Sequence, residues 1–208
     1  MTTPMPRSVA ATLAAFTLGF SAAAMADNDR NDGDRFSARL SGYNEVHFIA
    51  GSTLTNPITP PALRGAISTK ARGSFRAVID DSASTIHYEL SFEGLESAVT
   101  QAHIHFGQRH TVGGIVVWLC QTPGTPAPDL VASVTPFCPT PDGTVTGTIV
   151  PAQVLTATGQ GINTGEFDEV VRAIRAGAAY ANVHSTTFGA GEIRGQIRGG
   201  DGGHHDGD

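Results

Sequence analysis

The sequence predicts an all-β fold: an antiparallel β-sandwich, shaped as a flattened Greek-key-like barrel, with one short helix near residues 166–177. Charged residues make up only 15% of the 208 residues, against about a quarter in an average domain. Helix-favouring Glu, Lys and Leu are scarce, while Gly, Thr, Val and Ile are abundant. Apolar and polar residues alternate with a period of two in several short segments, which is typical of strands with one buried face.

These alternating segments define the expected strands. Residues 36–40 form the first, and residues 74–79 and 86–92 flank the turn sequence Asp80-Asp81-Ser82, which predicts an antiparallel hairpin. Residues 44–71 are rich in proline and are predicted to be a long irregular insertion. Further strands are expected at residues 101–106, 113–119, 143–149, 178–185 and 191–197.

One segment has helical spacing instead. Phe167, Val170, Val171 and Ile174 follow the i, i+3, i+4, i+7 pattern of a helix with one apolar face, and Gly177 is placed to end it. A single helix among many short strands agrees with the predicted sandwich.

The first 26 residues have the three parts of a secretory signal peptide: a basic start at Arg7, an apolar stretch over residues 9–20, and a cleavage site ending at Ala26. About 12 apolar residues are too few to span a bilayer core of roughly 30 Å. We therefore expect a secreted or periplasmic protein with no membrane span. Residues 27–34 are an acidic leader, residues 35–198 the domain, and residues 199–208 a Gly/Asp/His tail; both ends are expected to be flexible.

Charge and cysteine content restrict the function further. A net charge of −6 argues against a nucleic-acid partner, because binding would require neutralising phosphates. Cys120 and Cys138 are the only two cysteines in a chain with an export signal, so we expect a disulfide that closes the loop between them. Two cysteines without CxxC spacing do not make a closed zinc site.

Polar residues converge on one face of the predicted sheet. His103 and His105 alternate with apolar neighbours in one strand, and His184 does so in another. If the apolar residues face the core, the opposite face gathers the three histidines together with four supporting polar residues, Asn182, Glu192, Arg194 and Gln196.

Several motifs resemble the chordin-type (CHRD) domain. They are LSGYNEV at residues 40–46, AHIHFG at 102–107, GGIVVWL at 113–119 and AGAAYANVHSTTFGAGEIRGQI at 176–197. The resemblance spans residues 36–198, and Ser185, Ala190 and the long insertion depart from the usual pattern. It implies an antiparallel β-sandwich in an extracytoplasmic setting with a binding or structural role, and it transfers no catalytic residue.

Two interpretations of the histidine face remain open. An H-x-H strand with a third imidazole is a common way to build a copper or zinc site. Alternatively, the histidines form a structural ladder of hydrogen bonds to Glu192, Asn182 or backbone carbonyl groups. The expected partner is accordingly a metal ion or an extracytoplasmic protein. A copper-dependent redox enzyme that loosely resembles copper/zinc superoxide dismutase is the alternative function.

Overall fold

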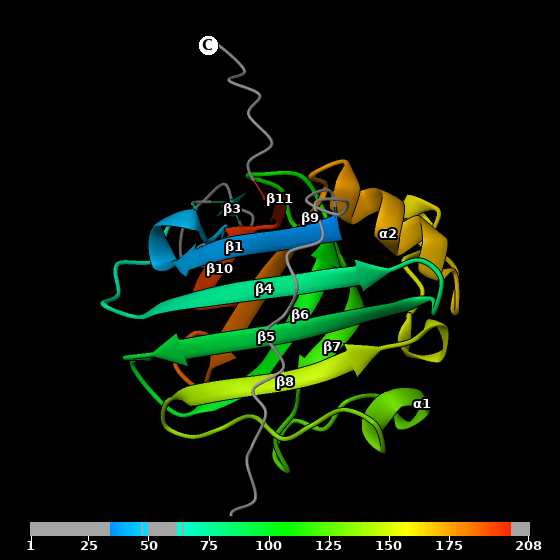
Figure 1. The fold of residues 1–208 in the computed structure, drawn as a ribbon. Coiled ribbons are helices and arrows are strands. Elements are labelled where there is room, and N and C mark those ends of the chain that lie inside the picture. The colour runs from blue at the N-terminus through cyan, green and yellow to red at the C-terminus, as the bar shows by residue number, and fades with distance from the viewer. Residues whose placement is uncertain (1–33, 47, 50–61, 64, 201–208) are drawn as a thin grey trace, which may run out of the picture.

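The computed structural model describes residues 34–46, 48, 49, 62, 63 and 65–200, and its strands confirm the predicted all-β class (Figure 1). The predicted signal peptide lies outside the described residues, as do most of the leader and the tail. The strands are β1 (Arg35–Ser41), β2 (Phe48–Ile49), β3 (Ala62–Leu63), β4 (Arg72–Asp80), β5 (Thr85–Glu93), β6 (Val99–Phe106), β7 (Gly114–Cys120), β8 (Gly143–Ile149), β9 (Ala179–Ser185), β10 (Ile193–Gln196) and β11 (Arg198–Gly199).

The main sheet is antiparallel and nearly closed. Its strand order is β7-β6-β9-β10-β1-β4-β5-β8, and β11 pairs with β1. In Figure 1, β1, β4, β5 and β8 form a front layer, and β7, β6, β9 and β10 form a back layer behind it. The edge strands β7 and β8 lie close together. The sheet therefore encloses a single core between its two layers.

The apolar residues of the period-two alternation form the core. In the β4–β5 hairpin, Phe75 lies opposite Leu90 and Ile79 opposite Ile86, and all four side chains are buried. The turn is closed by Asp80, whose Oδ1 accepts a hydrogen bond from the backbone N–H of the residue three positions later. The predicted hairpin is therefore confirmed.

Two loops are more ordered than the sequence predicted. The insertion over residues 44–71 contains a separate two-stranded sheet of β2 and β3. The predicted disulfide joins Cys120 and Cys138, but the loop that it closes also contains a short helix, α1 (Asp129–Ala132). The side chain of Gln121 organises this loop through hydrogen bonds to three backbone groups within it.

Helix α2 (Phe167–Arg175) covers one end of the barrel, where the sequence placed the only helix. Its apolar face is buried in the core. Gly177 follows the helix and has a φ of 65°, in the left-handed region. The backbone N–H of Ala178 then donates a hydrogen bond to Ala173 O at 2.8 Å. The described residues also contain the short 3-10 turns η2 (Gly42–Asn44), η3 (Pro151–Gln153) and η4 (Thr158–Gln160). Among the helices of the described residues, none is long and apolar enough to cross a membrane.

The closing strand gives a stability test. Ile193 and Ile197 are fully buried, as the alternation predicted. Truncating Ile193 to Ala should lower the free energy of unfolding by about 2–5 kcal/mol, because methyl groups are lost from a packed core. Urea unfolding measures the change, with Val78→Ala, at an outward-facing position of β4, as the control. A loss below about 1 kcal/mol for Ile193→Ala would show that this strand is not packed as described.

Candidate metal centre

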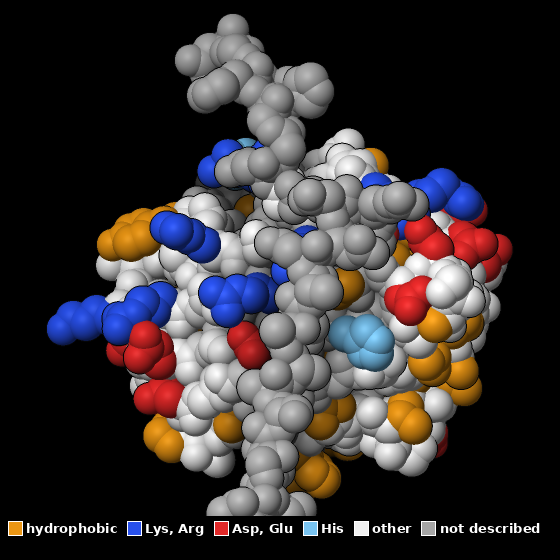
Figure 2. Space-filling view, in the orientation of Figure 1, with side chains coloured by type: hydrophobic (Ala, Val, Ile, Leu, Met, Phe, Trp, Pro, Cys, Tyr) orange, Lys and Arg blue, Asp and Glu red, His pale blue; other side chains and the backbone are white. Residues whose placement is uncertain are grey.

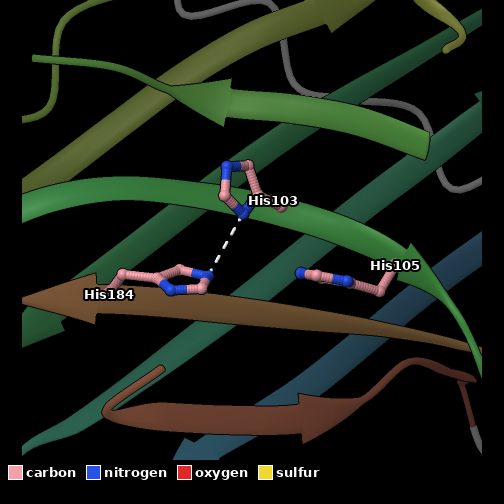
Figure 3. Close-up of side chains that lie close together, drawn as sticks. All are labelled: His103, His105 and His184. Atoms are coloured by element: carbon pink, nitrogen blue, oxygen red, sulfur yellow. Dashed lines mark hydrogen bonds between the residues drawn. The ribbon is translucent and has the colours of Figure 1, made fainter. Parts of the chain in front are cut away.

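Two neighbouring strands of the back layer carry the three histidines. Antiparallel pairing sets His103 of β6 opposite Asn182 of β9, and His105 opposite Tyr180. His184 lies two residues beyond Asn182 on β9, so its side chain leaves the same face of the layer. Figure 3 shows the three rings converging over β6 and β9, on the face turned away from the front layer.

The three imidazoles are close enough to share one ion. One nitrogen atom from each ring lies within 4.8 Å of the other two, and His103 Nδ1 is 3.2 Å from His184 Nε2. The exposed fractions of the residues are 0% for His103, 7% for His105 and 5% for His184. The structure thus brings all three predicted ligands together. Within the described part of the chain, no carboxylate, thiolate or further histidine joins them.

Backbone carbonyl groups orient two of the rings. His105 Nδ1 is 2.9 Å from Gly113 O, and His184 Nδ1 is 3.0 Å from Gly189 O. Because a carbonyl oxygen only accepts hydrogen bonds, each of these Nδ1 atoms carries the proton and each Nε2 keeps its lone pair. His103 Nδ1 then donates to His184 Nε2. The Nε2 atoms of His103 and His105 are buried and have no hydrogen-bond partner among the described residues.

Aromatic side chains hold two of the rings in place. Trp118 of β7 packs edge-on against His103, with 4.3 Å between ring centroids. Tyr180 stacks parallel to His105 at 4.7 Å. The guanidinium carbon of Arg194 lies 3.3 Å from the centroid of the Tyr180 ring, a cation–π contact. These contacts restrict the orientations that the two imidazoles can adopt.

Two of the predicted supporting residues hold the loop of residues 107–113, which supplies the Gly113 carbonyl group to His105. Arg194 donates to two carbonyl oxygens of this loop, at 2.6 and 3.0 Å. Gln196 donates to the first carbonyl of the loop at 2.9 Å. A Cβ atom at Gly113 would lie only 1.7 Å from a backbone oxygen of Phe106, so this close approach requires glycine.

Asn182, the third supporting residue, bonds to a buried carboxylate. Its Nδ2 donates to Glu45 Oε2 at 2.6 Å and to Ile193 O at 3.1 Å. Burial raises the pKa of Glu45, against the opposing effects of its hydrogen bonds and of the charge on Arg194. Gly191 leaves room for this pair, because a Cβ atom there would lie 2.6 Å from Glu45 Oε2.

Glu192, the fourth supporting residue, has different partners. Its Oε1 accepts hydrogen bonds from Thr69 Oγ1 at 2.8 Å and from the backbone N–H of Glu96 at 2.9 Å. No described histidine nitrogen bonds to it. Of the acceptors that the ladder interpretation named, backbone carbonyl groups bond to the histidines, whereas Glu192 and Asn182 do not.

Sequence reasoning missed two residues near the cluster. Trp118 is buried in a small apolar cluster with Ala127 and Val131 of the disulfide loop, and it also contacts His103. Glu45 had a signal in the LSGYNEV motif, but nothing in its spacing showed that Asn182 is its partner. Both contacts join segments far apart in the chain.

The other two described histidines, His87 and His110, do not join the cluster. His87 is exposed, and its Nδ1 lies 2.9 Å from Thr148 Oγ1. His110 is exposed in the loop of residues 107–113. His47, His204 and His205 lie outside the described residues.

Burial is the main reason why all three clustered histidines have lowered pKa values. The pKa of His103 falls well below its usual value, and the nearby His184 and His105 lower it further. Burial lowers the pKa of His105 to about 4, although its hydrogen bond to Gly113 opposes the change. The pKa of His184 is also lowered by burial, against the effect of its bond to Gly189. The imidazoles are therefore neutral at pH 7, the form that can donate a lone pair.

Comparison with known proteins gives one match. A family model described as the CHRD domain matches residues 36–197, a range that contains the three histidines and their supporting residues. A search of curated proteins found no match, and neither did a search of solved structures.

The lowered pKa values predict that the metal-free protein loses stability in mild acid. In the unfolded chain a histidine has a pKa near 6.5, whereas folded His105 has one of about 4. Between these values the unfolded chain binds more protons, so the contribution to stability is complete above pH 6.5 and is lost as the pH falls toward 4. Protonation of His105 alone should lower the free energy of unfolding by at most about 1.4 kcal/mol per pH unit in this range.

Urea unfolding with a chelator at pH 7, 6 and 5 measures this effect. The variant His105→Phe keeps a ring against Tyr180 but cannot be protonated, so its stability should fall less steeply than that of the wild type. His87→Phe, at an exposed position, should keep the wild-type slope. Equal slopes for the wild type and His105→Phe would contradict the prediction.

Proposed function

This chain belongs to the CHRD-domain family, and from that premise we propose that it is an exported, non-catalytic binding protein that captures a copper or zinc ion at His103, His105 and His184. The single observation that carries the proposal is the cluster of three buried, neutral imidazoles, with one nitrogen atom of each within 4.8 Å of the others.

The spacing of the nitrogen atoms supports a metal site. Zinc–imidazole bonds of about 2.0–2.1 Å put two ligands of one tetrahedral ion roughly 3.3 Å apart. The His103 Nδ1–His184 Nε2 pair, at 3.2 Å, already has that spacing, and metal binding through both atoms requires His103 to carry its proton on Nε2 instead of Nδ1. Because the nitrogen atoms lie within 4.8 Å of one another, a closure of at most about 1.5 Å by His105 would complete a three-nitrogen set. The unpartnered Nε2 atom of His105 keeps a lone pair for that purpose.

The donor set favours copper or zinc over the other common ions. Imidazole nitrogen suits Zn and Cu, whereas Mg and Ca prefer oxygen ligands, and no carboxylate joins the cluster within the described residues. Three protein ligands leave a coordination position open for water or for a donor from a partner. The alternative of a copper-dependent redox enzyme relies on the same three histidines, and no further ligand among the described residues favours it.

The second layer of contacts also fits a metal site. Metal-binding histidines commonly donate their other N–H to a carbonyl or carboxylate group, which fixes the ring orientation. The Gly113 and Gly189 carbonyl groups have this relation to His105 and His184. A structural ladder would account for these two bonds, but it leaves the buried Nε2 atom of His105 without a hydrogen-bond partner among the described residues.

The disulfide supports the export part of the proposal. Disulfides persist in oxidising compartments such as the periplasm and the extracellular space, and they are rare in the cytosol. The Cys120–Cys138 bond therefore agrees with a signal peptide over residues 1–26.

Metal binding is tested by calorimetry with Zn(II) and Cu(II). The parent protein for these measurements carries His204→Ala and His205→Ala, because these two histidines could bind metal independently. We expect one ion per chain. His105→Phe should weaken binding tenfold or more by removing one nitrogen ligand while keeping the ring against Tyr180.

His87→Ala is the matched control, since it removes an exposed histidine outside the cluster and should leave the affinity unchanged. Circular dichroism checks that each variant is folded. If the parent protein takes up neither ion, or if His105→Phe binds as tightly as the parent, the histidines form a structural ladder and the proposal is wrong.

Export predicts a processed N-terminus. When the full chain is expressed with a functional secretion pathway, the exported protein should begin at Asp27, because the signal peptide is cleaved after Ala26. Intact-mass measurement and N-terminal sequencing identify the first residue. Recovery of the protein only from the cytosol, with residues 1–26 still attached, would contradict the prediction.

A further inference from the structure

A polar hollow on the outer surface of β1, β10 and β11 is lined by four arginines. Its volume is about 550 Å³, within the range of about 300–1,000 Å³ that is usual for small-molecule sites. Arg39 of β1, Arg194 of β10 and Arg198 of β11 line it together with Arg109, which comes from the loop of residues 107–113. No acidic side chain lines the hollow.

The strand pairing explains why these cations gather. β1 lies between β10 and β4 in the sheet, and β11 pairs with the first half of β1. Arg39 is exposed on the outer face of β1, and its partner across the strands on β4 is the uncharged Ser74. Arg198 lies opposite Ser37. No carboxylate is therefore placed opposite these two arginines.

The pattern of ion pairs sets this hollow apart from the rest of the surface. The described arginines that pair with a carboxylate all lie outside the hollow, and none of the four that line it makes an ion pair with a described residue. Figure 2 shows Lys and Arg side chains over β1 and β4, with Asp and Glu side chains beside some of them. The arginines with carboxylate partners are Arg72, Arg76, Arg172 and Arg175.

One of the four arginines is held rigidly. Arg194 is 2% exposed, lies over the Tyr180 ring and donates to two backbone carbonyl groups. The carboxylate whose charge acts on it is that of the buried Glu45, which does not line the hollow. Arg194 thus forms a fixed cationic floor, while Arg39, Arg109 and Arg198 are exposed around it. The amide side chains of Asn44 and Gln196 add hydrogen-bonding groups to the lining.

We infer that this hollow binds a small polyanion that carries two or more phosphate or sulfate groups. The planar guanidinium group matches such oxyanions with paired N–H donors, and it stays charged at all physiological pH values. The hollow is large enough for several anionic groups, and arginines from four separate segments surround it. Because the whole chain carries a net charge of −6, general attraction cannot draw in an anion, and binding must depend on this local group. The inference involves none of the three histidines and is independent of the metal proposal.

Calorimetry with the full chain tests the site, with inorganic pyrophosphate and sucrose octasulfate as probes and neutral sucrose as the blank. We expect one probe molecule to bind per chain, and binding to weaken as the salt concentration rises. Tighter binding of pyrophosphate assigns the site to phosphate ligands, and tighter binding of sucrose octasulfate assigns it to sulfated sugars. If neither probe binds at low salt, the inference is wrong.

Substitutions then locate the binding. The double variant Arg39→Gln/Arg198→Gln keeps the Arg194 floor and should weaken binding of the preferred probe at least tenfold. Arg172→Gln, at an exposed position on α2 outside the hollow, should change it less than twofold. If the double variant binds the probe as tightly as the wild type, or if Arg172→Gln weakens binding as much as the double variant does, the inference is wrong. Thermal unfolding of each variant confirms that it is folded.

Discussion

The pairing of β6 with β9 decides which side chains meet on each face of the back layer. Side chains alternate along a strand, so a slip of one residue would send the histidines into the core and bring apolar side chains to the outer face. Ala102 and Ile104 of β6 and Val183 of β9 are completely buried between the layers. Hydrophobic burial of these residues holds the strands in register, and the register holds the three imidazoles together.

The cost of burying those imidazoles shapes the loops around them. A buried polar atom without a partner costs about 1–3 kcal/mol, and the carbonyl groups of Gly113 and Gly189 remove that cost for two nitrogen atoms. Hydrogen bonds from Arg194 and Gln196 help to hold the loop of residues 107–113, which supplies the Gly113 carbonyl group. The Nε2 atoms of His103 and His105 still have no hydrogen-bond partner among the described residues, and a metal ion bound at Nε2 of His105 would use one of these lone pairs.

Arg194 links the two proposed sites. Through its hydrogen bonds it holds the loop that orients His105, and through its position it forms the floor of the arginine hollow. Its guanidinium group also lies over Tyr180, which stacks on His105. Arg194, Tyr180 and His105 therefore pack in series, with an anion in the hollow contacting Arg194 at one end and a metal ion contacting His105 at the other.

The sequence by itself determined the longer strands of the main sheet, helix α2, the disulfide pairing and the shared face of His103, His105 and His184. These features depend on local alternation, on helical spacing or on having only two cysteines to pair. The tertiary structure alone decided that Trp118 packs on His103, that Glu45 bonds to Asn182, that Glu192 turns to Thr69, and that four arginines surround one hollow. Each of these contacts joins residues from different segments, and periodicity says which face a side chain leaves but not which strand or loop lies beside it.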